Sequence, residues 1–380
     1  MTDHLLKVSQ VSTRSVADPF GGWPASRPTA IQGPIEMESD DVVLEVKGLR
    51  VEFRTKRGVG RAVNDVSFVL RRGETLGLVG ESGSGKTVTA MSILGLHPKP
   101  AAHIVGGSVI FEGRDLVTLP AGELRRYRGS KISLIPQDPM TSLNPVFTVG
   151  SQIAEALELH TTLRGAALEE RAVELLSLLQ ISSPRDRLAS YPHQLSGGMR
   201  QRVVGAIALA GQPNVVIADE PTTALDATVQ AAYLELLREL QKVTGTAILF
   251  ITHDFGVVAD LCHRVAVMYG GHIVETAPTD ELFDRPAHPY THALISSVPD
   301  LDAVPNRLPS IEGQPPSIYD LPSGCPFRTR CWLYQSLGSP ERCRDEMPPL
   351  RSVGKEQAAS CHYSEKLGER TMIASGQGDA

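Results

Sequence analysis

Residues 80–87 read Gly80-Glu-Ser-Gly-Ser-Gly85-Lys86-Thr87, between the apolar run Glu74 to Val79 and the helix-like stretch Thr87 to Leu96. They fit the pattern G-x-x-x-x-G-K-[ST], in the strand-to-helix context that this phosphate-binding motif requires. Glycines let backbone N–H groups point at phosphate oxygens, and the helix that follows offers its positive N-terminus. We therefore predict that this loop binds a nucleoside triphosphate, with Mg²⁺ on the Thr87 hydroxyl. The predicted ligands are Gly80, Ser82, Gly83, Gly85, Lys86, Thr87 and Val88.

A second apolar run, Val215 to Ala218, ends on two acidic residues, Asp219 and Glu220. Ligand sites of parallel α/β sheets lie at the carboxyl ends of the strands. We therefore expect Asp219 to hold Mg²⁺ through water and Glu220 to orient or deprotonate an attacking water. A solvated acidic turn is the alternative, and the phosphate loop upstream argues against it.

Strand-like and helix-like stretches alternate through the middle of the chain, which predicts an α/β fold with a mostly parallel core sheet covered on both faces. We expect a flexible N-terminal extension over residues 1–41 and a catalytic domain over 42–285. Within that domain, apolar residues recur at helical spacing and predict a helical subdomain over about 138–200. Frequent prolines set residues 286–380 apart as a smaller C-terminal module.

Composition limits the classes of function. Among 380 residues, 43 are acidic and 37 are Lys or Arg, so the net charge of −6 argues against binding nucleic acid over the whole surface. No apolar stretch approaches the roughly 18 residues that cross a bilayer. The opening residues lack a signal-peptide pattern, so we expect a cytosolic chain.

Further motifs narrow the prediction to one family. They are Gln137 in Ile135-Pro-Gln-Asp-Pro139, Leu195-Ser196-Gly197-Gly198-Met199-Arg200-Gln201, Thr223-Ala-Leu-Asp226, and His253 in Ile251-Thr-His-Asp254. In order and spacing, together with the phosphate loop and the acidic strand end, they resemble the motifs of ATP-binding cassette (ABC) ATPases. The resemblance covers about Val42 to Pro286.

This resemblance implies an ABC-type P-loop ATPase whose cofactors are ATP and Mg²⁺. It implies a head-to-tail dimer, in which Ser196, Gly197 and Gly198 of one subunit close over the γ-phosphate bound by the other, and in which Asp226 acts across the interface. Glu220, His253 and Gln137 would be catalytic, and Thr87, Gln137 and Asp219 would hold Mg²⁺. Phe53 would stack on adenine, although a Phe at a strand end also fits simple core packing.

Two further segments resemble the ATP-binding subunits of oligopeptide and dipeptide importers. They are Gln137-Asp-Pro-Met-Thr-Ser-Leu-Asn-Pro145 and Arg285-Pro-Ala-His288-Pro289-Tyr290-Thr291, the latter followed by Ser297-Val-Pro299. The resemblance implies a peripheral protein at the cytoplasmic face of the membrane. Its partners would be two membrane-spanning permease subunits, a second ABC ATPase subunit, identical or homologous, and an extracytoplasmic peptide-binding protein. Nickel or glutathione import is the nearest alternative, and a soluble ABC ATPase of DNA repair or translation is a more distant one.

Four of the five cysteines fall in the C-terminal module, in the pattern C-x5-C-x11-C-x17-C: Cys325, Cys331, Cys343 and Cys361. Disulfides are a poor explanation in a reducing cytosol. Clustered thiolates could hold an iron–sulfur cluster or zinc and so organise a segment too small for its own core. Because the peptide-importer subfamily carries such a pattern, we predict a [4Fe–4S] cluster, with zinc or free thiols as alternatives. A metal or redox sensor built on these cysteines is a rival function.

Overall fold

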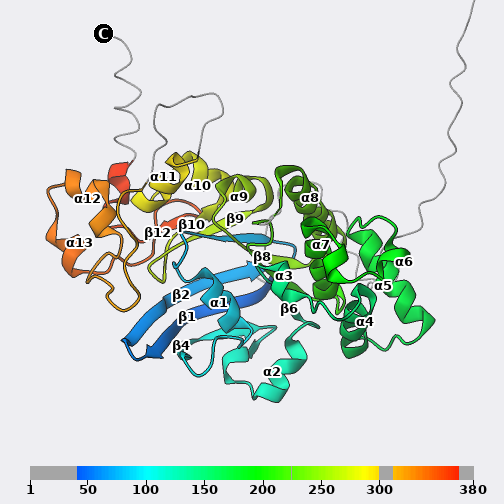
Figure 1. Ribbon diagram of the computed structural model, residues 1–380. Helices are drawn as coiled ribbons and strands as arrows, with labels where there is room; N and C mark the ends of the chain where they lie inside the picture. The colour runs from blue at the N-terminus through cyan, green and yellow to red at the C-terminus, as the bar shows by residue number, and fades with distance from the viewer. Residues whose placement is uncertain (1–40, 224, 299–310, 368–380) are drawn as a thin grey trace, which may run out of the picture.

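Two β-sheets lie at the centre of the molecule, with a helical unit at one end and the C-terminal region at the other (Figure 1). The computed structural model describes residues 41–223, 225–298 and 311–367. The predicted N-terminal extension, apart from Asp41, lies outside the described residues.

The larger sheet has eight strands in the order β11-β12-β10-β9-β3-β8-β7-β6. Strands β9, β3, β8, β7 and β6 are parallel, and β10 returns antiparallel to β9. Every residue of β3, β7 and β8 is buried, which explains why these strands read as apolar runs without alternation. The bounds are β3 Thr75–Val79, β6 Ile132–Ile135, β7 Val215–Asp219, β8 Ala247–Thr252, β9 Arg264–Tyr269, β10 His272–Pro278, β11 Arg351–Ser352 and β12 Ala358–Ala359.

The smaller sheet is antiparallel, in the order β2-β1-β4-β5. Its strands are β1 Val42–Thr55, β2 Gly58–Arg71, β4 Ala102–Phe111 and β5 Arg114–Asp115. Helix α1 (Lys86–Ile93) shares one apolar core with both sheets. That core fixes the start of α1, and with it the phosphate loop, against two sheets at once.

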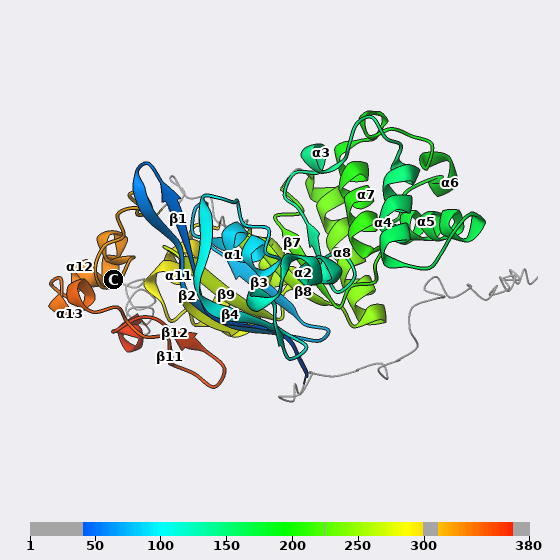
Figure 2. The same cartoon turned by 90° about the horizontal axis from the view of Figure 1, so that it is seen from below.

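Five helices between Pro139 and Leu209 form a helical unit beside the sheets (Figure 2). The apolar residues that predicted it are all buried: Leu168, Ala172, Leu175, Leu176 and Leu179. Its helices are α3 Pro139–Ser142, α4 Val149–His160, α5 Ala166–Leu178, α6 Pro184–Arg187 and α7 Gly197–Leu209. Outside it lie α2 Ala121–Tyr127, α8 Ala227–Thr244 and α9 Phe255–Leu261. No helix in the described parts of the chain is long and apolar enough to cross a membrane.

The region after Pro286 packs against the catalytic part of the chain and extends its larger sheet. Strand β12 pairs with β10, which places Ala359 beside Glu275. The elements of this region, with the helix that precedes it, are α10 Thr279–Asp284, α11 Pro289–Ser296, α12 Trp332–Ser336, α13 Glu341–Asp345, β11 Arg351–Ser352 and β12 Ala358–Ala359. Short 3-10 turns cover Leu116–Thr118, Pro192–Gln194, Arg328–Arg330 and Ser364–Lys366.

A buried carboxylate joins these pieces. Glu275 in β10 is fully buried and accepts hydrogen bonds from the backbone N–H groups of Ala287, at 2.7 Å, and His288, at 2.9 Å. The Gln357 side-chain amide donates a third, at 2.8 Å. His288 in turn caps α11, because its Nδ1 accepts from the Tyr290 N–H at 3.0 Å. The His-Pro-Tyr segment is therefore the start of a helix that a buried carboxylate anchors to the sheet.

Glu275→Ala should destabilise the protein by about 3 kcal/mol, because it leaves buried donors without acceptors. Urea unfolding measures the change. Glu365→Ala removes an exposed carboxylate paired with Arg351 and serves as the matched control. Equal unfolding midpoints for the two variants would show that Glu275 does not anchor the region.

Candidate active site

Glycines at two points let the phosphate loop lie against neighbouring strands. Gly80 has φ 153° and Gly85 has φ 109°, both in the region that favours glycine. A Cβ on Gly80 would lie 2.2 Å from the carbonyl oxygen of Met268 in β9. A Cβ on Gly85 would lie 2.5 Å from the carbonyl oxygen of Ala62 in β2. The loop therefore has its shape only with glycine at both positions.

The Lys86 ammonium is held inside this loop. Its Nζ donates to the carbonyl oxygens of Gly80, at 2.6 Å, and Glu81, at 3.0 Å. Burial lowers the pKa of Lys86, and the nearby carboxylates, Glu220 foremost, oppose that shift. The ammonium thus lies at the centre of the predicted phosphate site.

Two of the three residues predicted to hold Mg²⁺, Thr87 and Asp219, are in contact. The Thr87 hydroxyl donates to Asp219 Oδ1 at 3.2 Å. Hydroxyl and carboxylate oxygens are the ligands that Mg²⁺ prefers, so this pair fits the ion. Burial raises the pKa of Asp219, and the Thr87 hydrogen bond opposes that shift. The third predicted ligand, Gln137, instead contacts Glu220.

Three predicted catalytic residues converge at the ends of neighbouring strands. The Glu220 carboxylate accepts from Gln137 Nε2 at 2.9 Å and lies 3.3 Å from His253 Nδ1. These residues follow β7, β6 and β8, which are adjacent in the sheet. Glu220 itself has φ 46°, an uncommon conformation for a residue with a side chain, and its N–H donates to the Ile251 carbonyl at 2.9 Å. The backbone strain is therefore stored at the residue expected to activate water.

A cavity of about 970 Å³ joins the phosphate loop to these residues. Among the predicted residues that line it are Phe53, Ser82, Gly83, Gly85, Lys86, Thr87, Val88, Gln137, Glu220 and His253. Phe53 is only partly buried and also packs on the core of the smaller sheet, so both interpretations of this residue fit its position.

The predicted dimer-interface residues do not line this cavity. The Ser196 hydroxyl caps α7 by accepting from the Met199 N–H at 3.3 Å, and Gly197 follows it on the surface. A Cβ on Gly198 would lie 2.8 Å from Val229 in α8, so this glycine allows α7 and α8 to approach. Asp226 caps α8 and is exposed.

Several residues that complete the site were not predicted from the sequence. Thr223 Oγ1 donates to Glu220 at 3.3 Å, and its place in the Thr223 to Asp226 motif was the available signal. Other unpredicted lining residues come from the smaller sheet, the phosphate loop and the C-terminal region: Ala62, Glu81, Leu294, Ser297, Ile311 and Ile318. The last four lie far along the chain from the phosphate loop, so local sequence patterns gave no signal for them.

Comparison with known proteins gives the family. A family model described as ABC transporter matches residues 63–223, and one described as oligopeptide/dipeptide transporter, C-terminal region, matches residues 274–336. A probable peptide ABC transporter ATP-binding protein of Sinorhizobium fredii is 50% identical over 86% of this chain and 96% of its own length. The chain belongs to the ABC transporter family.

Two further relatives of this ABC protein and one solved structure support the same family and fold. The oligopeptide transport ATP-binding protein OppD of Escherichia coli is 49% identical over 84% of this chain and 94% of its own length. The dipeptide transport ATP-binding protein DppD of Bacillus subtilis is 50% identical over 76% of this chain and 86% of its own length. A dimeric ATP-binding cassette in a post-hydrolysis state, bound to ADP and Pi, superposes with a TM-score of 0.57 at 26% identity, over 62% of this chain and 98% of its own. The predicted ABC-type α/β fold is confirmed.

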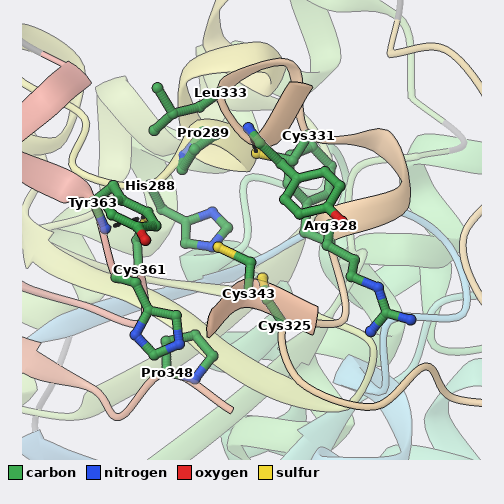
Figure 3. A pocket seen from close by; sticks show the side chains of 13 residues that line it. His288, Pro289, Cys325, Arg328, Cys331, Leu333, Cys343, Pro348, Cys361 and Tyr363 are labelled. Carbon is green, nitrogen blue, oxygen red and sulfur yellow. Dashed lines mark hydrogen bonds between the residues drawn. The ribbon is translucent and has the colours of Figure 1, made fainter. Parts of the chain in front are cut away.

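The iron–sulfur prediction is wrong. Cys325, Cys331, Cys343 and Cys361 do line one pocket (Figure 3). Its volume of about 20 Å³, however, has room for only about one water molecule. In the described ranges, no three His, Cys, Asp or Glu side chains form a group that could hold a metal ion, so the zinc alternative has no support either. The relatives are named simply as ATP-binding proteins.

The four thiols instead behave as buried apolar side chains. All four are free cysteines and buried. Burial raises the pKa of Cys325 and of Cys331 to about 12. Cys331 Sγ accepts from the Tyr334 N–H, and Cys361 Sγ from the Tyr363 N–H, each at 3.4 Å. These two hydrogen bonds close local turns. The rival function, a metal or redox sensor built on the cysteines, therefore has no support.

Lys86→Ala should lower the affinity for ATP by about a hundredfold, because it removes the buried ammonium from the phosphate site. Isothermal titration measures the affinity. Lys131→Ala, which removes a lysine with an exposed side chain, is the control and should bind as the parent does. Unchanged affinity in Lys86→Ala would contradict the assignment of the phosphate loop.

Proposed function

We propose that this chain is the ATP-hydrolysing subunit of an importer of oligopeptides or dipeptides. The observation that carries the proposal is the combination, in one chain, of the Lys86 and Glu220 site with a C-terminal region that matches the oligopeptide/dipeptide transporter model. The names of the relatives support peptides over nickel or glutathione as the transported class.

Hydrolysis begins with ATP on the phosphate loop. Lys86 and the backbone N–H groups of the loop hold the phosphates, while Phe53 contacts adenine. Thr87 and Asp219 would hold Mg²⁺, which would neutralise charge that develops on the phosphates. Glu220 orients the attacking water and takes its proton, with Gln137 and His253 fixing the carboxylate from either side.

The site is completed by a second ATPase subunit. Ser196, Gly197, Gly198 and Asp226 lie on the surface or near it and outside the cavity of their own chain, so they are available to the nucleotide of a partner. The dimeric assembly of the similar cassette supports this arrangement. ATP therefore joins the two subunits, and its hydrolysis lets them separate.

An exposed apolar loop of the helical unit is the proposed contact with membrane-spanning permease subunits at the cytoplasmic face. Val146 is 72% exposed and Phe147 54% exposed. The Gln152 side chain holds this loop, because its amide donates to the carbonyl oxygens of Asn144 and Phe147, each at 3.1 Å. The loop follows Gln137, so movement of the permease contact is linked to the catalytic carboxylate. An extracytoplasmic peptide-binding protein delivers the substrate in this complex.

Glu220→Gln should bind ATP but hydrolyse it at least about a hundredfold more slowly, because the amide cannot take the proton from water. The variant should accumulate as an ATP-bound dimer, measured by light scattering after gel filtration. Proteoliposomes with the permease subunits should import labelled peptide with the parent chain and not with the variant. Glu235→Gln, on the exposed face of α8, is the control. Turnover near the parent rate in Glu220→Gln would overturn the catalytic assignment.

Phe147→Asp should reduce co-purification with the permease subunits by about tenfold, because it places a charge in an apolar contact. Val243→Asp alters a residue that is 45% exposed on α8, far along the chain, and serves as the control. Equal recovery of permease with both variants would exclude this loop as the contact.

A further inference from the structure

We propose that Arg330 of the C-terminal region is a positioning residue for nucleotide binding, acting through Glu81 of the phosphate loop. The inference rests on the proposed binding of ATP by that loop. It concerns a contact between residues 249 positions apart, which no motif of the family predicted.

The first contact is a two-pronged ion pair. Arg330 Nη1 lies 2.6 Å from Glu81 Oε2, and Nη2 lies 3.0 Å from Glu81 Oε1. The Arg330 side chain is only 3% exposed, so water screens this pair weakly. Paired donors of this kind fix orientation as well as charge. Glu81 is thereby held in one position beside the loop that takes the phosphates.

The same guanidinium also holds another part of the cavity wall. Its Nε donates to the Glu312 carbonyl at 2.9 Å, and its Nη2 to the Ile311 carbonyl at 3.2 Å. Ile311 lines the nucleotide cavity together with Ile318 and Phe53. A single side chain therefore connects the phosphate loop to apolar wall residues of the cavity.

A second side chain from this region holds the backbone of the same loop residue. The Glu81 N–H donates to the Tyr290 hydroxyl at 2.9 Å. Tyr290 packs on Tyr269 with ring centroids 4.6 Å apart, and the Arg330 guanidinium lies 5.8 Å from the Tyr269 ring centroid. Glu81 is thus fixed through both its carboxylate and its backbone N–H.

Arg330 also acts on the site through its charge, because Glu81 carries a negative charge. Glu81 lines the cavity, so its carboxylate lies beside the place where a triphosphate binds, and Arg330 neutralises it. Without Arg330, the free carboxylate would repel the nucleotide and attract Lys86, whose Nζ already donates to the Glu81 carbonyl. ATP binding would weaken for both reasons.

The test compares ATP affinity in five variants of the full chain, which include Glu81→Gln and its combination with Arg330→Ala. Arg330→Ala should raise the dissociation constant by about tenfold. In a Glu81→Gln background the same change should raise it by less than about threefold, because no charge is left to neutralise. Arg342→Ala removes an exposed arginine of the same region, paired with Glu346, and should bind as the parent does. Tyr290→Phe, which removes one acceptor oxygen, should weaken binding by about threefold and provides a milder change if Arg330→Ala folds poorly.

Steady-state kinetics supply an independent measurement. Arg330→Ala should raise KM for ATP more than it lowers kcat, because Glu220, Gln137 and His253 stay in place. The inference is overturned if Arg330→Ala and Tyr290→Phe bind ATP as tightly as the parent, or if Glu81→Gln fails to reduce the effect of Arg330→Ala. Failure of the parent chain to bind ATP would instead refute the proposed function itself.

Discussion

The phosphate loop depends on two close backbone contacts that only glycine permits. Gly80 lies against β9 and Gly85 against β2, so the loop touches both sheets of the molecule. The Gly271 N–H donates to the Ser84 carbonyl at 3.0 Å, and the Asn64 N–H donates to the Gly271 carbonyl at 2.7 Å. The turn between β9 and β10 therefore links β2 to the loop. Binding of phosphate by this loop requires that the two sheets keep their spacing.

The position of the catalytic carboxylate, Glu220, depends on the ends of neighbouring strands. Because β6, β7 and β8 are parallel and adjacent, Gln137, Glu220 and His253 leave the sheet at one edge. The left-handed backbone of Glu220 turns the chain immediately after β7 and is held by the hydrogen bond from its N–H to Ile251. Strain of this kind persists only where surrounding contacts determine the geometry, and the fully buried strands supply them.

Local patterns predicted the parts of the fold whose causes are local. The apolar runs of β3, β7 and β8 and the glycines of the phosphate loop follow from burial and from backbone geometry over a few residues. The family motifs pointed to Gln137, Glu220 and His253 together, although the strand that precedes Gln137 was not predicted from its residues. The contacts of Arg330 with Glu81 and of Glu275 with Gln357 were not predictable, since 249 and 82 residues separate the partners and neither Arg330 nor Glu275 stands in a motif.

The cysteine prediction failed for a different reason. Spacing along the chain says which thiols could meet, but not how much space the surrounding side chains leave between them. Phe327, Leu333 and Tyr363 help to line the pocket of the four cysteines and reduce it to a volume of about 20 Å³. Phe327 and Leu333 also belong to the larger apolar core of the molecule, which therefore helps to order this segment.

The C-terminal region is accordingly a structural part of the nucleotide site. Its strand β12 extends the larger sheet, its link to Glu275 is buried, and Phe327 packs on Tyr269 and Tyr290 with ring centroids 5.2 Å apart. The rings of Tyr269 and Tyr290 lie next to Arg330 and Glu81, so packing in this region reaches the phosphate loop through direct contacts. Because protein interiors are close-packed, a change in volume at Phe327 must move these rings or leave a cavity. The region that distinguishes this chain from a minimal ABC cassette therefore acts on the step common to all of them, the binding of ATP.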